Sequence, residues 1–288
     1  MKRWIQRACL SLSMVLLAVP AAVAQWQFDL LRETTTPLSN PHDIKLAPDG
    51  RHLFVSDVGG DQVVVLDRMS LERVDAFGSN ELDGTHDVDF DGAGRAYVAD
   101  THNGRVAIYA LTGTRGSLVG ELSDRLSGPE GVLVHPNGLI YVGGAWSNNV
   151  VAFRDGEVVH ELKGLSAPHD LELNTDGRIW LADSGNNRIL LLSETLEIIA
   201  ELRGPPYHFD GVRYLDVLPD GTLLAADKYS HTLKVIGPGR DVVATLGNGQ
   251  HGVERGFLKT PEGVDSEGDL LWLSDSGNDR VLLFRMRR

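Results

Sequence analysis

A repeat of about 44 residues runs through most of this 288-residue chain. In each copy an apolar run follows Pro-His-Asp or a similar tripeptide, and a polar turn leads to a second apolar run that usually ends at an aspartate. The equivalent positions at the start of the six copies are His42, His86, Glu130, His169, Arg213 and Glu262. They lie 44, 44, 39, 44 and 49 residues apart, a period that is typical of propellers and solenoids.

Each copy has the pattern of four short strands. A turn such as Pro48-Asp49-Gly50 closes the first hairpin, and a loop rich in Gly and Asn, as at 185–187, follows the second strand. A third strand, as at 188–192, and a more polar fourth strand, as at 158–162, complete the unit. No segment shows a convincing helical periodicity. Four-stranded units of this length predict the blades of an all-β, six-bladed propeller.

The two ends of the repeat array predict how the ring closes. The last copy ends at Arg288, directly after its third strand, and lacks a fourth. The segment Trp26 to Arg32, which precedes the first copy, has the character of the missing strand. We therefore expect the N-terminal strand to complete blade six and to cover the strand edges that an open array would expose.

Two loops within the repeats have a recognisable motif. The segments 182–189 (Ala-Asp-Ser-Gly-Asn-Asn-Arg-Ile) and 273–281 (Leu-Ser-Asp-Ser-Gly-Asn-Asp-Arg-Val) resemble NHL repeats. The resemblance extends over nearly the whole chain after residue 24 and implies a six-bladed propeller. It implies little about function, because this fold supports many different activities.

The first 24 residues have the features of a signal peptide. Basic residues precede an apolar stretch at 10–19, which is too short to span a bilayer, and Ala22-Val23-Ala24 has the small residues of a cleavage site. Cleavage there would remove Cys9, the only cysteine, and leave a single propeller domain at 25–288. The sequence therefore predicts a periplasmic or secreted protein.

The chain is strongly acidic, with a formal net charge of −13. The predicted mature chain keeps 24 basic and 40 acidic residues and so reaches −16. Such a surface argues against nucleic acids and anionic membranes as partners. No segment after the leader is apolar enough to cross a membrane, so we expect no membrane span in the mature chain.

The first strand of a propeller blade lines the central channel, and all six equivalent positions in that strand are polar. They are His42, His86, Glu130, His169, Arg213 and Glu262. Three imidazoles and two carboxylates that converge on one axis predict a divalent-metal site, with zinc as the first candidate. An open coordination position would then allow catalysis. Alternatively, these side chains neutralise one another, with Arg213 paired to Glu130 or Glu262.

The loop that follows the second strand lies on the same face as this ring, because the two strands are antiparallel. It carries Lys228 and Tyr229 in blade five, Trp146 in blade three and His102 in blade two. Lys228 is a candidate to stabilise developing negative charge, and Tyr229 a candidate general acid or base. Trp146 is a candidate wall of a binding pocket. The alternative for each is an ordinary exposed loop residue.

Two further sets of aspartates are predicted to be structural. The aspartates at the end of the second strand are expected to accept backbone N–H bonds and to shape the turn. They are Asp57, Asp100, Asp183, Asp227 and Asp275. The aspartates that follow the ring histidines, Asp43, Asp87 and Asp170, are expected to turn to the opposite face of the strand and to bond a neighbouring blade.

Pro-His-Asp at a strand start, with Ala-Asp some ten residues later, also resembles the peptidyl-alpha-hydroxyglycine alpha-amidating lyase family. That family has a six-bladed propeller and binds zinc through channel histidines that follow a proline. By this resemblance His42 and His169 match the zinc ligands, and His86 matches apart from Thr85 in place of the proline. The family histidines come from alternate blades, whereas here they come from blades one, two and four.

The resemblance also implies roles for other residues. Among alternate blades, the set His86, His169 and Glu262 is a chemically sound zinc site, which leaves His42 as an extra or outer ligand. Tyr229 matches a family tyrosine that lies two residues after a repeat aspartate, and Lys228 lies where a family arginine can lie.

This chain lacks one feature of the family: no arginine follows a repeat aspartate at the position of the family's catalytic arginine. Arg213, on the ring itself, is the candidate charge partner in its place.

Three functional hypotheses follow. The first is an exported metal-dependent lyase, or a related metal enzyme, that acts on a small-molecule or peptide substrate at the channel mouth. The second is a non-catalytic propeller that binds a peptide, a glycan or a protein partner on its top face. The third is a calcium-centred lactone hydrolase, for which Glu130 and Glu262 are suitable hard ligands. It ranks below the others because the chain lacks a ring rich in Asn and Asp.

Overall fold

The computed structural model describes residues 26–288, and the predicted signal peptide lies outside them. Blade one consists of β2 (Pro41–Leu46), β3 (His52–Asp57), β4 (Gln62–Asp67) and β5 (Arg73–Phe77). Blade two consists of β6 (Thr85–Phe90), β7 (Arg95–Asp100), β8 (Arg105–Thr112) and β9 (Arg115–Leu122). Blade three consists of β10 (Pro129–Val134), β11 (Ile140–Gly144), β12 (Asn149–Arg154) and β13 (Glu157–Lys163). Each sheet is antiparallel, with its strands in sequence order.

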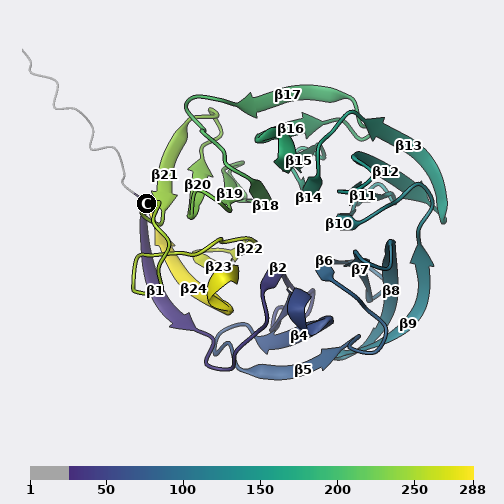
Figure 1. Ribbon diagram of the computed structural model, residues 1–288, viewed down its shortest axis with the longest axis horizontal. Helices are drawn as coiled ribbons and strands as arrows, with labels where there is room; N and C mark the ends of the chain where they lie inside the picture. The colour runs from purple at the N-terminus through teal and green to yellow at the C-terminus, as the bar shows by residue number, and fades with distance from the viewer. Residues whose placement is uncertain (1–25) are drawn as a thin grey trace, which may run out of the picture.

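The second half of the ring repeats this plan. Blade four consists of β14 (Pro168–Leu173), β15 (Ile179–Asp183), β16 (Arg188–Leu192) and β17 (Ile198–Arg203). Blade five consists of β18 (Val212–Val217), β19 (Leu223–Asp227), β20 (Thr232–Ile236) and β21 (Val242–Leu246). Blade six consists of β22 (Val264–Glu267), β23 (Leu270–Asp275), β24 (Arg280–Arg287) and, from the N-terminus, β1 (Gln27–Glu33). Short 3-10 turns, η1 (Val58–Gly60), η2 (Ser184–Asn186) and η3 (Ser276–Asn278), follow the second strands of blades one, four and six. The predicted all-β, six-bladed propeller is confirmed (Figure 1).

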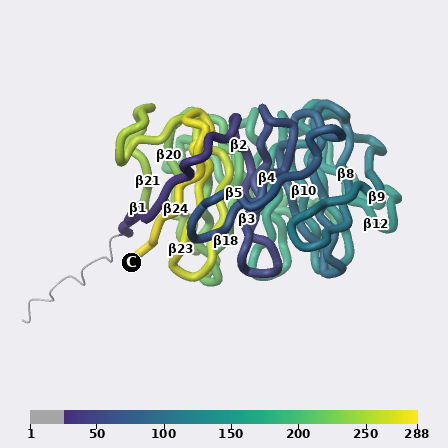
Figure 2. Tube along the Cα trace, turned by 90° about the horizontal axis from the view of Figure 1, so that it is seen from below, coloured from purple at the N-terminus to yellow at the C-terminus, as the bar shows by residue number. Residues whose placement is uncertain are grey.

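The predicted closure of the ring is also confirmed. β1 pairs antiparallel with β24, and the register joins Gln27 to Arg287 and Phe28 to Met286. The N-terminal strand is therefore the outermost strand of blade six and runs along the side of the disc (Figure 2). Within residues 26–288, no helix has the length and hydropathy needed to cross a membrane.

The core lies between adjacent blades, and the alternation of side chains along each strand supplies both of its neighbours. In β15, Ile179 and Leu181 pack with blade three, whereas Trp180 and Ala182 pack with blade five. Because successive side chains of a strand point to opposite faces, a strand that is covered on both faces must be apolar throughout. The short apolar runs that mark each copy of the repeat follow from this burial.

The aspartates that end the second strands are structural, as their position in the repeat predicts. Each uses one carboxylate oxygen to accept a backbone N–H bond from the segment that leads into its own blade. In blade four, Asp183 Oδ1 accepts from the Ser166 N–H at 2.7 Å. The equivalent donors are Ser39 for Asp57, Asp83 for Asp100, Asp210 for Asp227 and Lys259 for Asp275. Blade three has Gly144 at this position, and Ser147 Oγ accepts the N–H of Ser127 at 3.1 Å instead.

Candidate functional site

The six ring positions meet at the channel, as the repeat alignment predicts. The inner strands β2, β6, β10, β14, β18 and β22 surround the axis of the disc (Figure 1). Five of the six side chains are buried, and only Arg213 is half-buried. The rings of His42 and His86, from neighbouring blades, have centroids 4.5 Å apart in an edge-to-face arrangement.

One carboxylate of the ring lies among bases from blades one and five. Glu262 is fully buried, and its Oε1 lies 3.3 Å from His42 Nε2. Lys228, from the loop after β19, places its Nζ 2.5 Å from the same oxygen. The loop residue that the sequence indicated therefore reaches the ring itself, and its ammonium neutralises the buried carboxylate.

The other carboxylate is paired on the opposite side of the ring. Glu130 contacts His169, and Arg213 contacts the same imidazole. The Arg213 guanidinium lies 3.9 Å from Glu130 Oε2. The sequence left open whether Arg213 pairs with Glu130 or Glu262, and the structure places it with Glu130. The closest contacts of the ring thus join neighbouring blades.

The protonation states of the ring follow from burial and charge. Burial, together with the nearby His86 and Lys228, lowers the pKa of His42 well below its usual range. Burial also lowers the pKa of His86. For Glu130, burial alone would raise the pKa, but the neighbouring His169 and other bases outweigh it and lower the pKa to about 2. The site thus presents the neutral imidazoles of His42 and His86 and the ionised carboxylate of Glu130.

The hydrogen bonds of His86 determine which of its nitrogens is free. Nδ1 lies 2.9 Å from the carbonyl oxygen of Gly84, which can only accept, so Nδ1 carries the proton. Nδ1 also lies 2.8 Å from Thr101 Oγ1, and that hydroxyl donates to the Pro129 carbonyl. Nε2 is therefore unprotonated in the neutral ring and available as a base or a ligand. The sequence did not predict the role of Thr101 in orienting this ring.

The donor types suit a metal, but their positions do not form a metal site as they stand. Glu262 Oε1 faces Lys228 and His42, whereas Glu262 Oε2 and His42 Nδ1 are buried without a hydrogen-bond partner in the part of the chain that the structure describes. Unsatisfied nitrogen and oxygen donors of this kind are what zinc binds. However, no three His, Cys, Asp or Glu side chains of residues 26–288 are arranged around a common point to hold an ion.

Tyr229 lies at the edge of the ring and is 52% exposed. Its side chain lies flat against Gly211, where a Cβ atom would meet the Tyr229 ring at 2.6 Å. With Arg213 it borders a small pocket of about 170 Å³ between blades four and five. Of the three catalytic candidates, Lys228 and Arg213 contact the ring, whereas Tyr229 lies beside it.

The packing of an aromatic loop residue on a glycine, as Tyr229 packs on Gly211, recurs in two other blades. We call such a glycine a glycine seat. His102 lies against Gly84 and Trp146 against Gly128, and a Cβ atom at either glycine would overlap the ring. The two rings stack, with centroids 5.8 Å apart. In the remaining blades the pattern is inverted, because the loop residue is the glycine and a Ser or Thr packs on it. These glycines are Gly59, Gly185 and Gly277.

The two arrangements can be told apart in the sequence. Where the ring is on the loop, an aromatic residue stands two positions after the end of the second strand, and a glycine stands directly before the first strand of the same blade. The pairing was missed because its two members lie 18 residues apart, as Gly128 and Trp146 do. Trp146 packs on the Gly128 backbone and stacks with His102, yet it is 55% exposed.

A second polar layer lies deeper in the channel. The predicted bonds from the aspartates to neighbouring blades are present: Asp87 Oδ2 accepts from the Val132 N–H at 2.6 Å, and Asp170 Oδ2 from the Leu215 N–H at 2.7 Å. The simple alternation of faces that was expected here does not hold, because the pairing register of these inner strands shifts, for example between Pro41 and Ile44.

Deeper still, a lysine and a carboxylate meet across the channel. Lys45 of blade one contacts Glu172 of blade four, with Nζ 3.0 Å from Oε2. Burial alone would lower the pKa of Lys45, but Glu172 and other carboxylates outweigh it and raise the pKa well above its usual value. The sequence did not predict this layer.

Comparison with known proteins supports the architecture. The NHL repeat family matches residues 165–190. The chain is a six-bladed β-propeller with an NHL repeat. No curated protein matches it. Among solved structures, it is similar to a streptogramin B lyase at 14% identity and a TM-score of 0.66, over 91% of this chain and 98% of the other.

Two further solved structures have the same fold. A catalytically inactive variant of virginiamycin B lyase from Staphylococcus aureus, with quinupristin, is 13% identical with a TM-score of 0.66, over 91% of this propeller and 99% of the lyase. A protein of unknown function from Bacteroides thetaiotaomicron is 15% identical with a TM-score of 0.73, over 91% and 72%. At these identities the likeness concerns the fold alone.

Proposed function

We propose that the protein is a lyase whose active centre is the polar ring at the channel mouth. The observation that carries the proposal is the convergence of three buried histidines and two carboxylates, with Lys228 among them. Buried ionisable groups of opposite character with displaced pKa values are typical of catalytic sites. The reaction class is taken by analogy from lyases of the same fold.

The residues of the ring can divide the work of an elimination. In the ring without a metal, the unprotonated Nε2 of His86 can accept a proton from the substrate, whereas with zinc bound this nitrogen would be a ligand and would not act as the base. The ammonium of Lys228 stabilises negative charge that develops on a substrate oxygen, and the Tyr229 hydroxyl donates the proton that the leaving group needs. Arg213 holds Glu130 and can bind a substrate carboxylate.

We further propose that the ring binds zinc, with His42, His86 and Glu262 as the first ligands. These three side chains make the closest set of free donors, and neutral histidine with carboxylate suits zinc. His169 and Glu130, already paired, are the remaining candidate ligands. Calcium is the second candidate because carboxylate oxygens are hard ligands. When bound, such an ion supplies Lewis acidity toward a substrate oxygen.

Metal content of the purified protein tests the metal proposal independently of activity. We expect about one equivalent of zinc per chain by inductively coupled plasma mass spectrometry, and loss of that metal in the His42→Ala, His86→Ala double variant. A His160→Ala variant, on the outer strand β13, is the matched control and should keep its metal. Equal trace metal in all three proteins would refute the metal proposal.

Turnover tests the lyase proposal directly. The candidate substrates are streptogramin B antibiotics, suggested by the similar lyases, and peptides that end in α-hydroxyglycine, suggested by the sequence motifs. The first would be opened by elimination, and the second would split into a peptide amide and glyoxylate. Mass spectrometry should detect one of these products with the native protein and none with Lys228→Ala. Absence of both products would leave a binding role as the better proposal.

A second candidate function is the binding of a peptide, a glycan or a protein partner on the top face. The observation that favours it is the set of half-exposed rings on glycine seats, because aromatic faces that protrude beside a polar cleft are typical of binding surfaces. Binding to a peptide or glycan array that is lost in Trp146→Ala, without any turnover, would support it.

We also propose that the protein acts outside the cytoplasm, in a periplasm or the medium, after removal of residues 1–24. N-terminal sequencing of protein from its native host should then begin at Gln25.

A further inference from the structure

The connection between blades five and six, residues 247–263, is unusually long and covers a cavity at the side of the disc. We call this connection the roof. Seventeen residues, 247–263, separate β21 from β22, whereas seven residues, 78–84, separate the corresponding strands of blades one and two. The longer connection accounts for the spacing of 49 residues between the last two copies of the repeat.

Contacts to blade six hold this roof in place. Asn278 Nδ2 donates to the Gly252 carbonyl at 2.7 Å, and Arg280 Nη2 donates to the Val253 carbonyl at 3.1 Å. Within the loop, the ring of Phe257 packs directly on Gly252, where a Cβ atom would meet Phe257 Cδ1 at 2.8 Å. A roof that is tied down in this way makes a preformed pocket, which lowers the entropic cost of binding.

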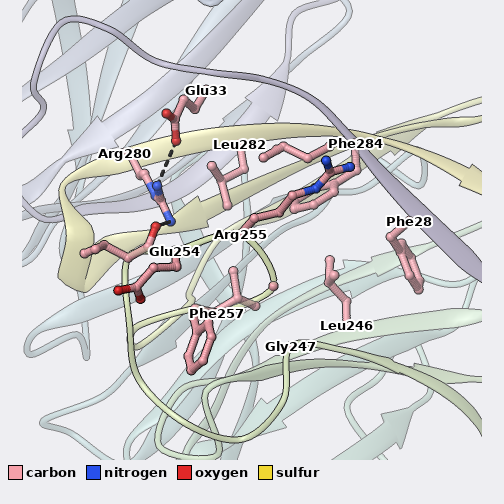
Figure 3. A pocket seen from close by; sticks show the side chains of 14 residues that line it. Phe28, Glu33, Leu246, Gly247, Glu254, Arg255, Phe257, Arg280, Leu282 and Phe284 are labelled. Carbon is pink, nitrogen blue, oxygen red and sulfur yellow. Dashed lines mark hydrogen bonds and ion pairs between the residues drawn. The ribbon is translucent and has the colours of Figure 1, made fainter.

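A cavity of about 240 Å³ lies under the roof. Its walls are mainly apolar and come from three parts of the chain: the N-terminal strand β1, the end of β21 with the loop, and β24 (Figure 3). The principal apolar side chains are Phe28, Leu246, Phe257, Leu258, Leu282 and Phe284. Pockets for drug-sized ligands are usually about 300–1,000 Å³, so this cavity suits a small or slender molecule.

The two arginines at the cavity differ in their pairing. Arg280 is neutralised, with Nε 2.8 Å from Asp275 Oδ2 and Nη1 2.7 Å from Glu33 Oε2. Arg255 has no carboxylate oxygen within 4.0 Å anywhere in residues 26–288. Figure 3 shows its side chain among those that line the cavity, whereas the neighbouring Glu254 extends the other way. Arg255 is therefore an unpaired cation at the border of an apolar cavity.

We propose that this cavity binds an aliphatic carboxylate of medium chain length. The hydrocarbon chain would lie against Phe28, Leu246 and Phe284, where burial of each methylene is favourable. The carboxylate would pair with Arg255, whose planar guanidinium suits two parallel hydrogen bonds. A cationic amphiphile would meet Arg255 with like charge, and a neutral alcohol would leave the arginine unpaired.

Titration calorimetry with decanoate, decanol and decyltrimethylammonium tests the proposal. The native mature protein should bind decanoate saturably and at least tenfold more tightly than decanol, with no detectable binding of the cation. Arg255→Gln should remove the preference for decanoate over decanol. The matched control is Arg115→Gln, an arginine with an 84% exposed side chain on β9 of blade two, which should bind as the native protein does.

A second variant separates the cavity from the surface. Leu246→Trp fills the space with a larger side chain and should abolish binding of both decanoate and decanol. Because Arg255 is exposed, Arg255→Gln should keep its fold if Leu246→Trp does not, and circular dichroism checks both. Equal affinity for decanoate and decanol in the native protein, or unchanged decanoate affinity in a folded Arg255→Gln, overturns the proposal.

The cavity is separate from the proposed active centre. None of its lining residues belongs to the ring at the channel mouth. The His42→Ala, His86→Ala variant should therefore still bind decanoate, so that failure of one proposal leaves the other standing.

Discussion

At the scale of single residues, the buried aspartates connect each blade to the segment that enters it. Asp183 is fully buried and serves three groups: the Ser166 N–H, the Asn186 amide and the Arg188 guanidinium. A carboxylate has enough lone pairs to accept all three bonds, which neither a serine nor an asparagine can match in this position. This demand explains why an aspartate recurs in five of six blades.

Replacement of this aspartate tests its structural role. Asp183→Ala leaves the partly buried Ser166 N–H without its partner and leaves Arg188 with only the partly exposed Glu201, so we expect it to lower the free energy of unfolding by about 2–4 kcal/mol. Urea denaturation followed by circular dichroism measures the loss. Asp124→Ala, whose side chain is 65% exposed, is the control and should change stability by less than about 0.5 kcal/mol. A similarly small change in Asp183→Ala would contradict the structural interpretation.

The glycine seats make a second prediction at this scale. Gly128 has φ +55° and lies under Trp146, so Gly128→Ala introduces both backbone strain and a clash with the indole. We expect a loss of about 2–3 kcal/mol and a shift in tryptophan fluorescence.

A control separates the two causes of that loss. Gly94 has φ +79°, and a Cβ atom added there would have no neighbour within 4 Å, so Gly94→Ala should cost only about 1 kcal/mol. Adding Trp146→Gly to Gly128→Ala should recover part of the difference, and purely additive effects would argue against the seat.

At the scale of whole elements, the N-terminal strand decides whether the ring is closed. β1 pairs only with β24, and its Phe28 and Leu30 pack on the core of blade six. Without β1, β24 would present an unpaired edge and Phe284 would lose part of its cover. An exposed edge of this kind pairs readily with other chains.

Deletion of this strand therefore has a clear expected outcome. A chain that begins at Thr34 should unfold at lower urea concentration and should associate into dimers or larger species in size-exclusion chromatography with light scattering. A synthetic peptide of residues 25–33 should restore the monomer, whereas a scrambled peptide should not. A truncated chain that stays monomeric and equally stable would show that closure does not depend on β1.

At the scale of the whole molecule, the channel brings many carboxylates into one buried column. Burial raises the pKa of Asp89 to about 6, despite the opposing effect of Lys45, and it raises the pKa of Asp265 to about 6 in the same way. An acid whose pKa is higher in the folded state favours folding at low pH, and this contribution is lost as pH rises from about 4 to about 6.

Surface acids act in the opposite sense. The hydrogen bond from Arg288 lowers the pKa of Asp220 to about 2, so its contribution is present above about pH 4 and lost as pH falls toward 2. The lowered pKa values of His42 and His86 act in the same sense as Asp220, because these buried imidazoles must become charged as pH falls below about 6.5. The channel aspartates with raised pKa values are more numerous, so we expect stability to be greatest near pH 4–5 and to fall toward pH 7.5, which chemical denaturation at several pH values would measure.

The variant Asp89→Asn isolates the buried contribution. It removes a charge that costs roughly 3 kcal/mol to ionise in the folded chain, so it should flatten the profile between pH 4 and 7. The Phe90 and Val134 N–H groups bond different oxygens of Asp89, so the asparagine, with one oxygen, also loses one hydrogen bond at every pH. Asp241→Asn, on an exposed turn, is the control and should leave the profile unchanged. A native profile that rises steadily to pH 7.5 would contradict this account of the channel.

The repeat period alone determined the fold class, the number of blades, the closing strand and the six positions that face the channel. These properties depend on local alternation and on a regular spacing, both of which are visible along one chain. The second and third strands were placed accurately, as in 188–192, because turn residues bound them on both sides.

Only the tertiary structure decided which ring residues pair. The choice of Glu130 rather than Glu262 for Arg213, the reach of Lys228 into the ring, and the ion pair of Lys45 with Glu172 all join residues from different blades. The same holds for the cavity under 247–258, which unites both chain ends with one loop. Such contacts depend on side-chain lengths and directions across a closed ring, and burial then sets the charges that the site carries.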